Sequence, residues 1–226
     1  MKRISIIPIL VLIAAGGTTF AGTAEEMNEE EKDKPGPAYD LTNSASTLYW
    51  EGYKPGGMHH GTVEVVTGDA LTDGNMITGG TFEIDLTTIR NDDIGNDGMR
   101  NRLVNHLKSK DFFYIEEFPR AYFEITGVRP VEASAGDVPE NSTHMVTGDM
   151  TIRGNTYEIS FPAEITMEEQ MIRAQTGKIK LNRTRWEVNH MSKSVFGGLK
   201  DNFINDEMVV KLDLRFDRRT AGQRGQ

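Results

Sequence analysis

The chain has 226 residues, of which 37% are hydrophobic and 26% charged, the composition of a globular protein long enough to bury a core. Its formal charge of −9 makes nucleic acids and anionic membrane surfaces poor partners, because their phosphates would repel it. Cysteine is absent, which excludes disulfides, thiolate metal sites and cysteine nucleophiles.

Residues 1–24 predict a secretory signal peptide. Two basic residues precede an apolar run that ends at Ala15, and small residues suited to cleavage follow. The run is too short to span a bilayer core of about 30 Å. We therefore expect no integral membrane segment in the mature chain, and a periplasmic or secreted protein.

The rest of the chain predicts one domain with polar ends. Residues 25–37 form a charged, acidic segment that we expect to be a disordered linker, and residues 218–226 form a polar tail of the same kind. The domain is expected to occupy residues 38–217.

Alternation of apolar and polar residues recurs eight times in this domain. The apolar positions, strand by strand, are Leu48 and Trp50; Val63 and Val65; Phe82, Ile84 and Leu86; Ala121, Phe123 and Ile125; Val146, Gly148, Met150 and Ile152; Tyr157, Ile159, Phe161, Ala163 and Ile165; Ile179 and Leu181; and Met208, Val210, Leu212, Leu214 and Phe216. Strands with one apolar face each favour an antiparallel barrel or sandwich over a parallel α/β sheet.

One helix is predicted at residues 98–108, between the third and fourth strands. Met99, Leu103 and Leu107 recur at helical spacing, with Val104 beside them, and give the helix one apolar stripe. Phe112 and Phe113 follow directly. Two interpretations stay open for this aromatic pair: it covers the end of an apolar cavity, or it fills a solid core.

Signatures of catalysis and metal binding are missing. The five histidines (His59, His60, His106, His144 and His190) show no ligand spacing, so we expect surface histidines and no metal or cofactor. Glu83 and Asp85 share a strand face that is expected to meet water. Ser192 and Ser194 lie near a histidine but outside any nucleophile motif.

Arg183 and Arg185 share strand parity with Ile179 and Leu181, so one of the two guanidinium groups could face an apolar interior, unless a bulge turns both outward. A buried arginine needs an anionic partner. That partner would be the head group of a ligand, with Lys180 assisting, or an internal carboxylate.

The ordered motifs HLKSKDFF at 106–113, FPRAYFEI at 118–125 and VTGDMTIRGNTYEISFPAEI at 146–165 resemble the bacterial YceI-like family. The resemblance also includes the strand with Trp50, GGTFEIDL at 79–86, LNRTRW at 181–186 and the last strand at 208–216, and it covers essentially the whole of residues 38–217. It implies an all-β fold: an extended, eight-stranded, antiparallel, lipocalin-like barrel with the helix at one end, around an apolar tunnel.

The resemblance also implies a ligand, an isoprenoid or other amphiphilic lipid that is carried or stored. We assign the tunnel and its cover to Phe82, Ile84, Leu86, Leu103, Leu107, Phe112, Phe113, Phe123, Ile125, Met150, Tyr157 and Phe161, and the head group to Arg183 and Lys180.

Two other hypotheses remain. One is a structural or stress-response barrel filled by its own side chains. The other is an enzyme acting on an amphiphile, with His59, His60 or His106 as a base, although we do not expect an enzyme. The sequence leaves open whether two chains form a homodimer.

Overall fold

The computed structural model describes residues 38–131 and 138–220. The expected signal peptide, the acidic linker and most of the expected tail lie outside the described residues. The helices and strands are β1 (Ala38–Leu41), the 3₁₀ helix η1 (Asn43–Ala45), β2 (Thr47–Lys54), β3 (Gly57–Asp73), β4 (Met76–Asn91), α2 (Asp97–Lys108), β5 (Arg120–Pro130), β6 (His144–Ile152), β7 (Asn155–Met167), β8 (Met171–Thr176), β9 (Ile179–Asn182), the 3₁₀ helix η2 (Arg183–Trp186) and β10 (Glu207–Arg218).

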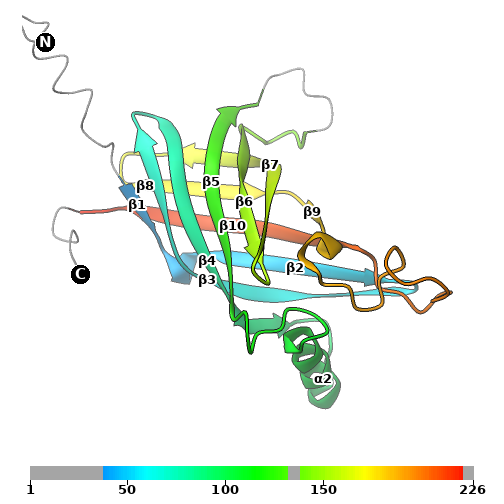
Figure 1. Ribbon diagram of the computed structural model, residues 1–226. Coiled ribbons are helices and arrows are strands. Elements are labelled where there is room, and N and C mark those ends of the chain that lie inside the picture. Colours follow the sequence, from blue (N-terminus) through cyan, green and yellow to red (C-terminus); the bar gives the residue numbers. More distant parts are fainter. Residues whose placement is uncertain (1–37, 132–137, 221–226) are drawn as a thin grey trace, which may run out of the picture. The chain divides into compact units, whose positions relative to one another are not determined.

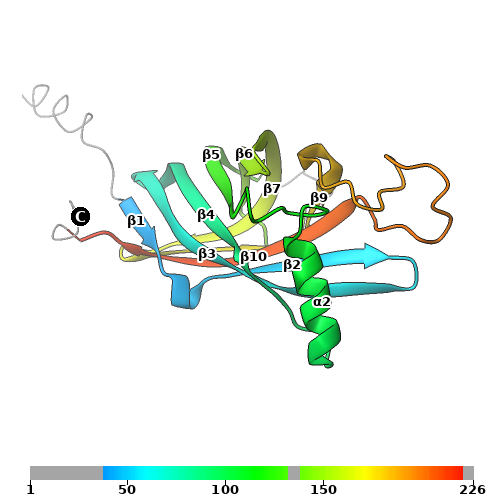
Figure 2. The same cartoon turned by 60° about the horizontal axis from the view of Figure 1, so that its bottom comes forward.

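The strands form one antiparallel sheet that closes on itself (Figure 1). Neighbours in the chain pair from β2 to β8, and β10 closes the barrel by pairing with both β2 and β8. β1 precedes β2 in the chain and, like β2, lies between β3 and β10 (Figure 2), and β9 extends β8 along β10. The predicted eight-stranded barrel is confirmed. β1 and β2 together fill one of its eight strand positions, and β8 and β9 fill another.

The pairing registers place the predicted apolar residues on one face. Phe82 pairs with Phe123, Phe123 with Met150, and Trp50 with Val210, and directly paired residues of antiparallel strands share a face. Local turn chemistry supports this register. Arg153 and Gly154 both have positive φ (50° and 72°), as a two-residue hairpin between β6 and β7 requires.

Helix α2 interrupts the meander between β4 and β5. The Asn96 side chain caps it by accepting a hydrogen bond from the Met99 backbone N–H (3.0 Å). The predicted stripe is wrong at one position, because Met99 is 65% exposed, whereas Leu107 is buried. Only the C-terminal half of α2 therefore packs on the barrel.

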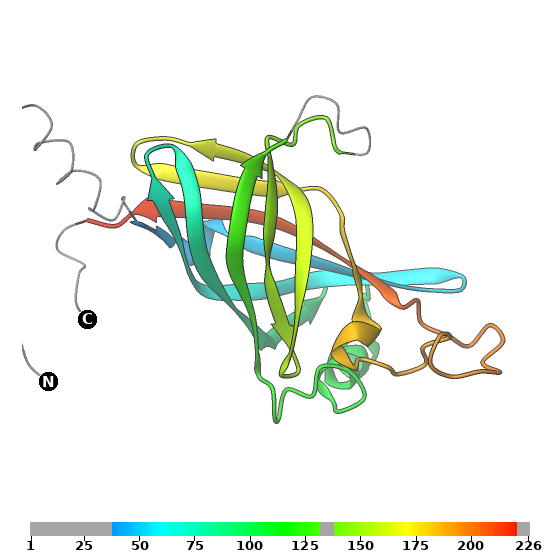
Figure 3. The same cartoon turned by 45° about the horizontal axis from the view of Figure 1, so that its top comes forward.

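Three segments gather at the same end of the barrel, which we call the α2 end: α2, η2 and the chain from 187 to 206 (Figures 1 and 3). η2 is anchored there by Trp186, which is fully buried and donates its indole N–H to the Met150 carbonyl (3.0 Å). This contact joins β6 to the segment that follows β9. β9 itself pairs only with β10 in the described sheet, so Trp186 adds a link on its other side.

Candidate functional site: an apolar cavity inside the barrel

The barrel encloses a cavity of about 210 Å³. Its wall is almost entirely aliphatic and aromatic, and every strand from β2 to β10 contributes to it. Ten of the twelve residues assigned to the tunnel from the sequence line it: Phe82, Ile84, Leu86, Leu107, Phe112, Phe113, Phe123, Ile125, Met150 and Phe161. A closed barrel with an apolar interior can take up the apolar part of a ligand.

Four phenylalanines from different strands run through the barrel interior. The Phe82 ring lies 5.7 Å from Phe216 and 6.1 Å from Phe123, and the Phe123 ring lies 5.6 Å from Phe161, measured between centroids. These are favourable aromatic spacings. The phenylalanines divide the interior and limit how much empty volume the barrel retains.

Glycine makes this aromatic packing feasible at Gly148. A Cβ atom there would lie 2.5 Å from the Phe123 ring and 2.4 Å from the Glu124 carbonyl oxygen. Only a residue without a side chain leaves room for the ring at this position. Gly148, an inward-facing position of the sequence pattern, therefore makes room for the Phe123 ring.

The α2 end covers the cavity with the residues that follow the helix. Leu107 and Phe112 are buried and Phe113 is half-buried. The chain turns there through hydrogen bonds from the Phe112 N–H to the Ser109 carbonyl (3.1 Å) and from the Phe113 N–H to the Leu107 carbonyl (3.1 Å). The aromatic pair thus lies across the cavity end, and both rings contribute to its wall.

Two assigned tunnel residues lie elsewhere. Leu103 packs against the core without reaching the cavity, because α2 contacts the barrel only near its C-terminus. Tyr157 has the inward parity of β7 but lies beyond the cavity, 38% exposed, with its ring edge-on to Trp186 at 5.7 Å. Parity gives the face of a strand residue but not whether the cavity extends that far.

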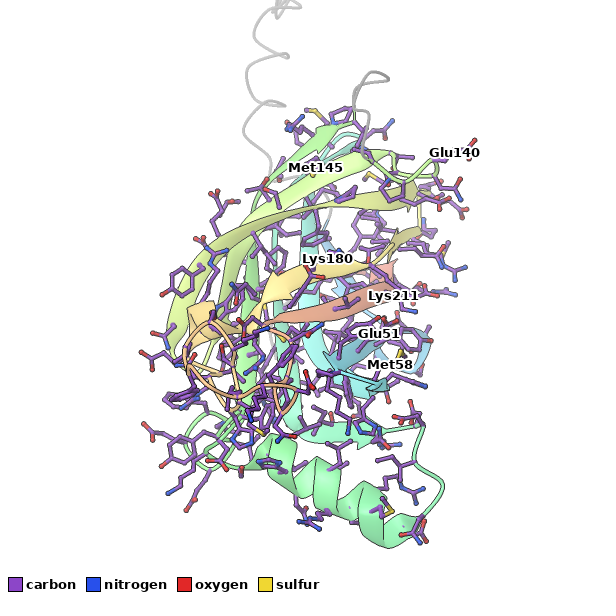
Figure 4. The ribbon with its side chains drawn as sticks, turned by 90° about the vertical axis from the view of Figure 1, so that its right-hand side faces the viewer. Glu51, Met58, Glu140, Met145, Lys180 and Lys211 are labelled. Atoms are coloured by element: carbon purple, nitrogen blue, oxygen red, sulfur yellow. The ribbon has the colours of Figure 1, made fainter. Side chains whose placement is uncertain are left out.

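Lys180, predicted from the sequence to bind the head group, does not line the cavity. Ile179 and Leu181 face the cavity, so Lys180 between them points outward, where it pairs with Glu207 (3.2 Å). Figure 4 shows Lys180 with Lys211 and Glu51 on the outside of β9, β10 and β2.

Arg183 does reach the cavity wall, and its side chain is 4% exposed. Its guanidinium donates to the carbonyls of Asn205 (2.9 Å), Ile204 (3.0 Å) and Val188, and Asp206 lies 3.7 Å away. Burial lowers the pKa of Arg183, and the Asp206 charge opposes that effect. The structure thus favours the internal partner over the head group: Arg183 holds the 187–206 segment.

Sequence reasoning missed that the 187–206 segment and several polar residues line the cavity. Val188, Ile204 and Asn205 line the cavity, although they belong to no strand of the barrel. Five polar residues are also among those that line the cavity: Glu51, Thr176, Arg183, Asn205 and Glu207. Glu51 is held by Lys178 (2.7 Å) and Tyr53, and these hydrogen bonds lower the pKa of its carboxyl.

The polar groups considered for catalysis lie in structural contacts. Glu83 and Asp85 both pair with Arg120 on the outer face of β4 and β5. Burial alone would raise the pKa of Asp206, but hydrogen bonds from Ser192 and Ser194 outweigh it and lower that pKa. The wall of the cavity contains no histidine among the residues that the structure describes.

A family model described as the YceI-like domain matches residues 39–216, from the start of β1 to near the end of β10. The chain belongs to the YceI-like family. The UPF0312 protein plu2095 of Photorhabdus laumondii subsp. laumondii is 36% identical over 63 residues, so the match spans 28% of this chain and 28% of that relative.

Two solved structures share the fold of this YceI-like chain. BcnA of Burkholderia cenocepacia gives a TM-score of 0.59 at 18% identity, over 77% of this chain and 98% of that one. A polyisoprenoid-binding domain from Saccharophagus degradans gives 0.55 at 14% identity, over 81% and 99%. In the described part of the chain, no helix has the length and apolar character needed to cross a membrane.

Proposed function

We propose that this YceI-like protein binds an elongated apolar or amphiphilic ligand, in the first place an isoprenoid lipid, inside its barrel. The observation that carries the proposal is the apolar cavity of about 210 Å³ enclosed by the strands. Burial of a hydrocarbon tail would drive binding at about 0.8 kcal/mol per CH₂ group. The Saccharophagus degradans domain, described as polyisoprenoid-binding, supports the same ligand class through its shared fold.

The volume of the cavity bounds the ligand. An apolar cavity of about 150 Å³ admits a benzene-sized molecule, and typical ligand pockets measure about 300–1,000 Å³. At about 210 Å³, the barrel as it stands accommodates a short apolar segment. A long polyprenyl tail would require the phenylalanines of the interior to change rotamer or the α2 end to open.

The polar end of an amphiphile would lie near Asn205, an exposed residue that lines the cavity and belongs to the 187–206 segment. The charged side chains of Glu51, Glu207 and Arg183 are already held by ion pairs or hydrogen bonds within the protein.

The signal peptide predicted from the sequence supports a location in the periplasm or outside the cell for this function. We also propose binding rather than catalysis. His59, His60 and His106 lie outside the cavity wall, so none is positioned as a base against a ligand held there.

The four phenylalanines in mutual contact favour a second candidate, a barrel that is filled by its own side chains and binds nothing. Mass spectrometry of an organic extract from mature protein, purified gently from its native periplasm, separates the two. We expect a stoichiometric isoprenoid. An empty extract, together with no binding of added prenyl alcohols of increasing length, would favour the self-filled barrel.

A further inference from the structure

Three side chains that are distant in sequence meet at the α2 end of the barrel, outside the cavity. His106 lies in the last turn of α2, Asp111 follows the helix, and His190 belongs to the 187–206 segment. His106 Nε2 lies 3.4 Å from Asp111 Oδ2, and His190 Nδ1 lies 4.0 Å from the same oxygen. We propose that these three side chains form a binding site for a divalent transition-metal ion, with Zn²⁺ as the best fit.

The spacing of the ligand atoms suits such an ion. Zinc binds imidazole nitrogen and carboxylate oxygen at about 2.0–2.2 Å, so the ligand atoms of a tetrahedral site lie about 3.3–3.5 Å apart. The three atoms here lie within 4.8 Å of one another, and one pair is already at 3.4 Å. Small side-chain rotations would bring the other pairs of ligand atoms to the spacing of a tetrahedral site.

The donor set determines the class of metal. Two imidazoles and one carboxylate suit zinc, copper or nickel, whereas calcium and magnesium prefer oxygen ligands. Three protein ligands leave a position for water, so the ion is expected to bind more weakly than in a four-ligand structural site.

The surroundings hold the two imidazoles in place. The His106 and His190 rings meet edge to face with centroids 4.6 Å apart, and the Phe112 ring lies 5.0 Å from the first and 5.3 Å from the second. Asp111 is half exposed, which gives an ion a route from solvent.

The position of the site gives it a consequence for the cavity. Its ligands join the α2 segment, which supplies Leu107, Phe112 and Phe113 to the wall, to the segment that supplies Val188 and Ile204. A bound ion would therefore fasten together two segments that cover the same end of the barrel. Arg153 already bridges them by donating to the carbonyls of Phe112 (3.1 Å) and Glu187 (2.6 Å).

The test uses the mature chain without a histidine tag, treated with EDTA and then dialysed. Isothermal titration with ZnCl₂ should show one saturable site. His190→Ala and Asp111→Asn should each weaken binding at least tenfold, while His144→Ala on β6 should bind as the wild type does. Co²⁺ should give the visible absorption of a tetrahedral site in the wild type and lose it in His190→Ala.

Folding is checked separately, by far-UV circular dichroism and the melting temperature in EDTA. Both ligand variants replace partly exposed side chains and should melt within a few degrees of the wild type. Zn²⁺ should raise the melting temperature of the wild type and of His144→Ala only. Absence of saturable Zn²⁺ binding, or equal binding by His190→Ala and the wild type, would overturn the site. The readouts need no lipid, so they are independent of the proposed function.

Discussion

Phe113 is where the two interpretations of the aromatic pair can be separated. It is half-buried and lines the cavity, whereas Phe112 beside it is buried. Phe113→Asp should therefore abolish uptake of a prenyl probe while lowering the melting temperature only modestly, because the carboxylate can turn toward solvent at the barrel end. The measurements are a binding titration and a thermal melt.

The matched control is Phe196→Asp. Phe196 is 48% exposed and lies in the 187–206 segment without lining the cavity, so its replacement should leave binding unchanged. A Phe113→Asp protein that loses folding and binding together would show that Phe113 is core and that the cover is not separable from the fold.

Arg183 has a structural role that the outward-facing Lys180 lacks. Arg183→Ala removes the donor to three carbonyls and leaves Asp206 without its cationic neighbour. Loss of a buried, multiply bonded charge costs about 3–5 kcal/mol, so a urea titration should show a large loss of stability. Lys180→Ala should cost less than about 1 kcal/mol, because its ion pair is exposed. Equal, small effects would return Arg183 to the head-group hypothesis.

Between elements, Asp93 ties the start of β3 to the chain that follows β4. Burial alone would raise the pKa of the Asp93 carboxyl, but hydrogen bonds from the His60 backbone N–H (2.9 Å), the His59 ring (2.8 Å) and the Asn91 amide lower it to about 2. Its ordinary value is 3.8. A carboxyl whose folded pKa is depressed stabilises the fold above its unfolded pKa and loses that contribution as the pH falls toward 2.

Asp93→Asn should accordingly lower the free energy of unfolding at pH 7 by on the order of 1 kcal/mol, a figure reduced for the partial exposure of the side chain. The difference from the wild type should shrink between about pH 4 and pH 2. Asp92→Asn serves as the control, since Asp92 makes none of these side-chain contacts. A difference that stays constant down to pH 2 would contradict the assignment.

In the barrel interior, side chains that stabilise the fold also reduce the volume that a ligand can occupy. Phe161 belongs to the aromatic row and lines the cavity, and its truncation would enlarge the space that a ligand can occupy. Phe161→Ala should cost about 3–5 kcal/mol in stability. It should also shift the preferred prenyl alcohol to a longer chain, as measured by a binding series. Tyr122→Ala removes an exposed ring from β5 (48% exposed) and should change neither property. An unchanged length preference in Phe161→Ala would place the ligand elsewhere.

Much of the fold could be predicted from local pattern. The period-2 alternation located eight strand positions, because each inward side chain must be apolar and each outward one polar, and the registers agree with it. The predicted helix at 98–108 is confirmed within one residue. β1 and β8 were missed since they are short and extend positions already occupied by β2 and β9.

The candidate site was predicted less completely, and the reason lies in how the barrel closes. Strand parity determined that Phe82, Phe123 and Phe161 face inward and favoured an antiparallel barrel or sandwich, and the resemblance of the motifs to the YceI-like family predicted the closed barrel. Only the tertiary structure decided where the cavity ends, which put Tyr157 outside it, and which distant groups meet. Arg183 with the carbonyls of the 187–206 segment, and His106 with Asp111 and His190, come together through long-range packing at the α2 end, which no sequence period encodes.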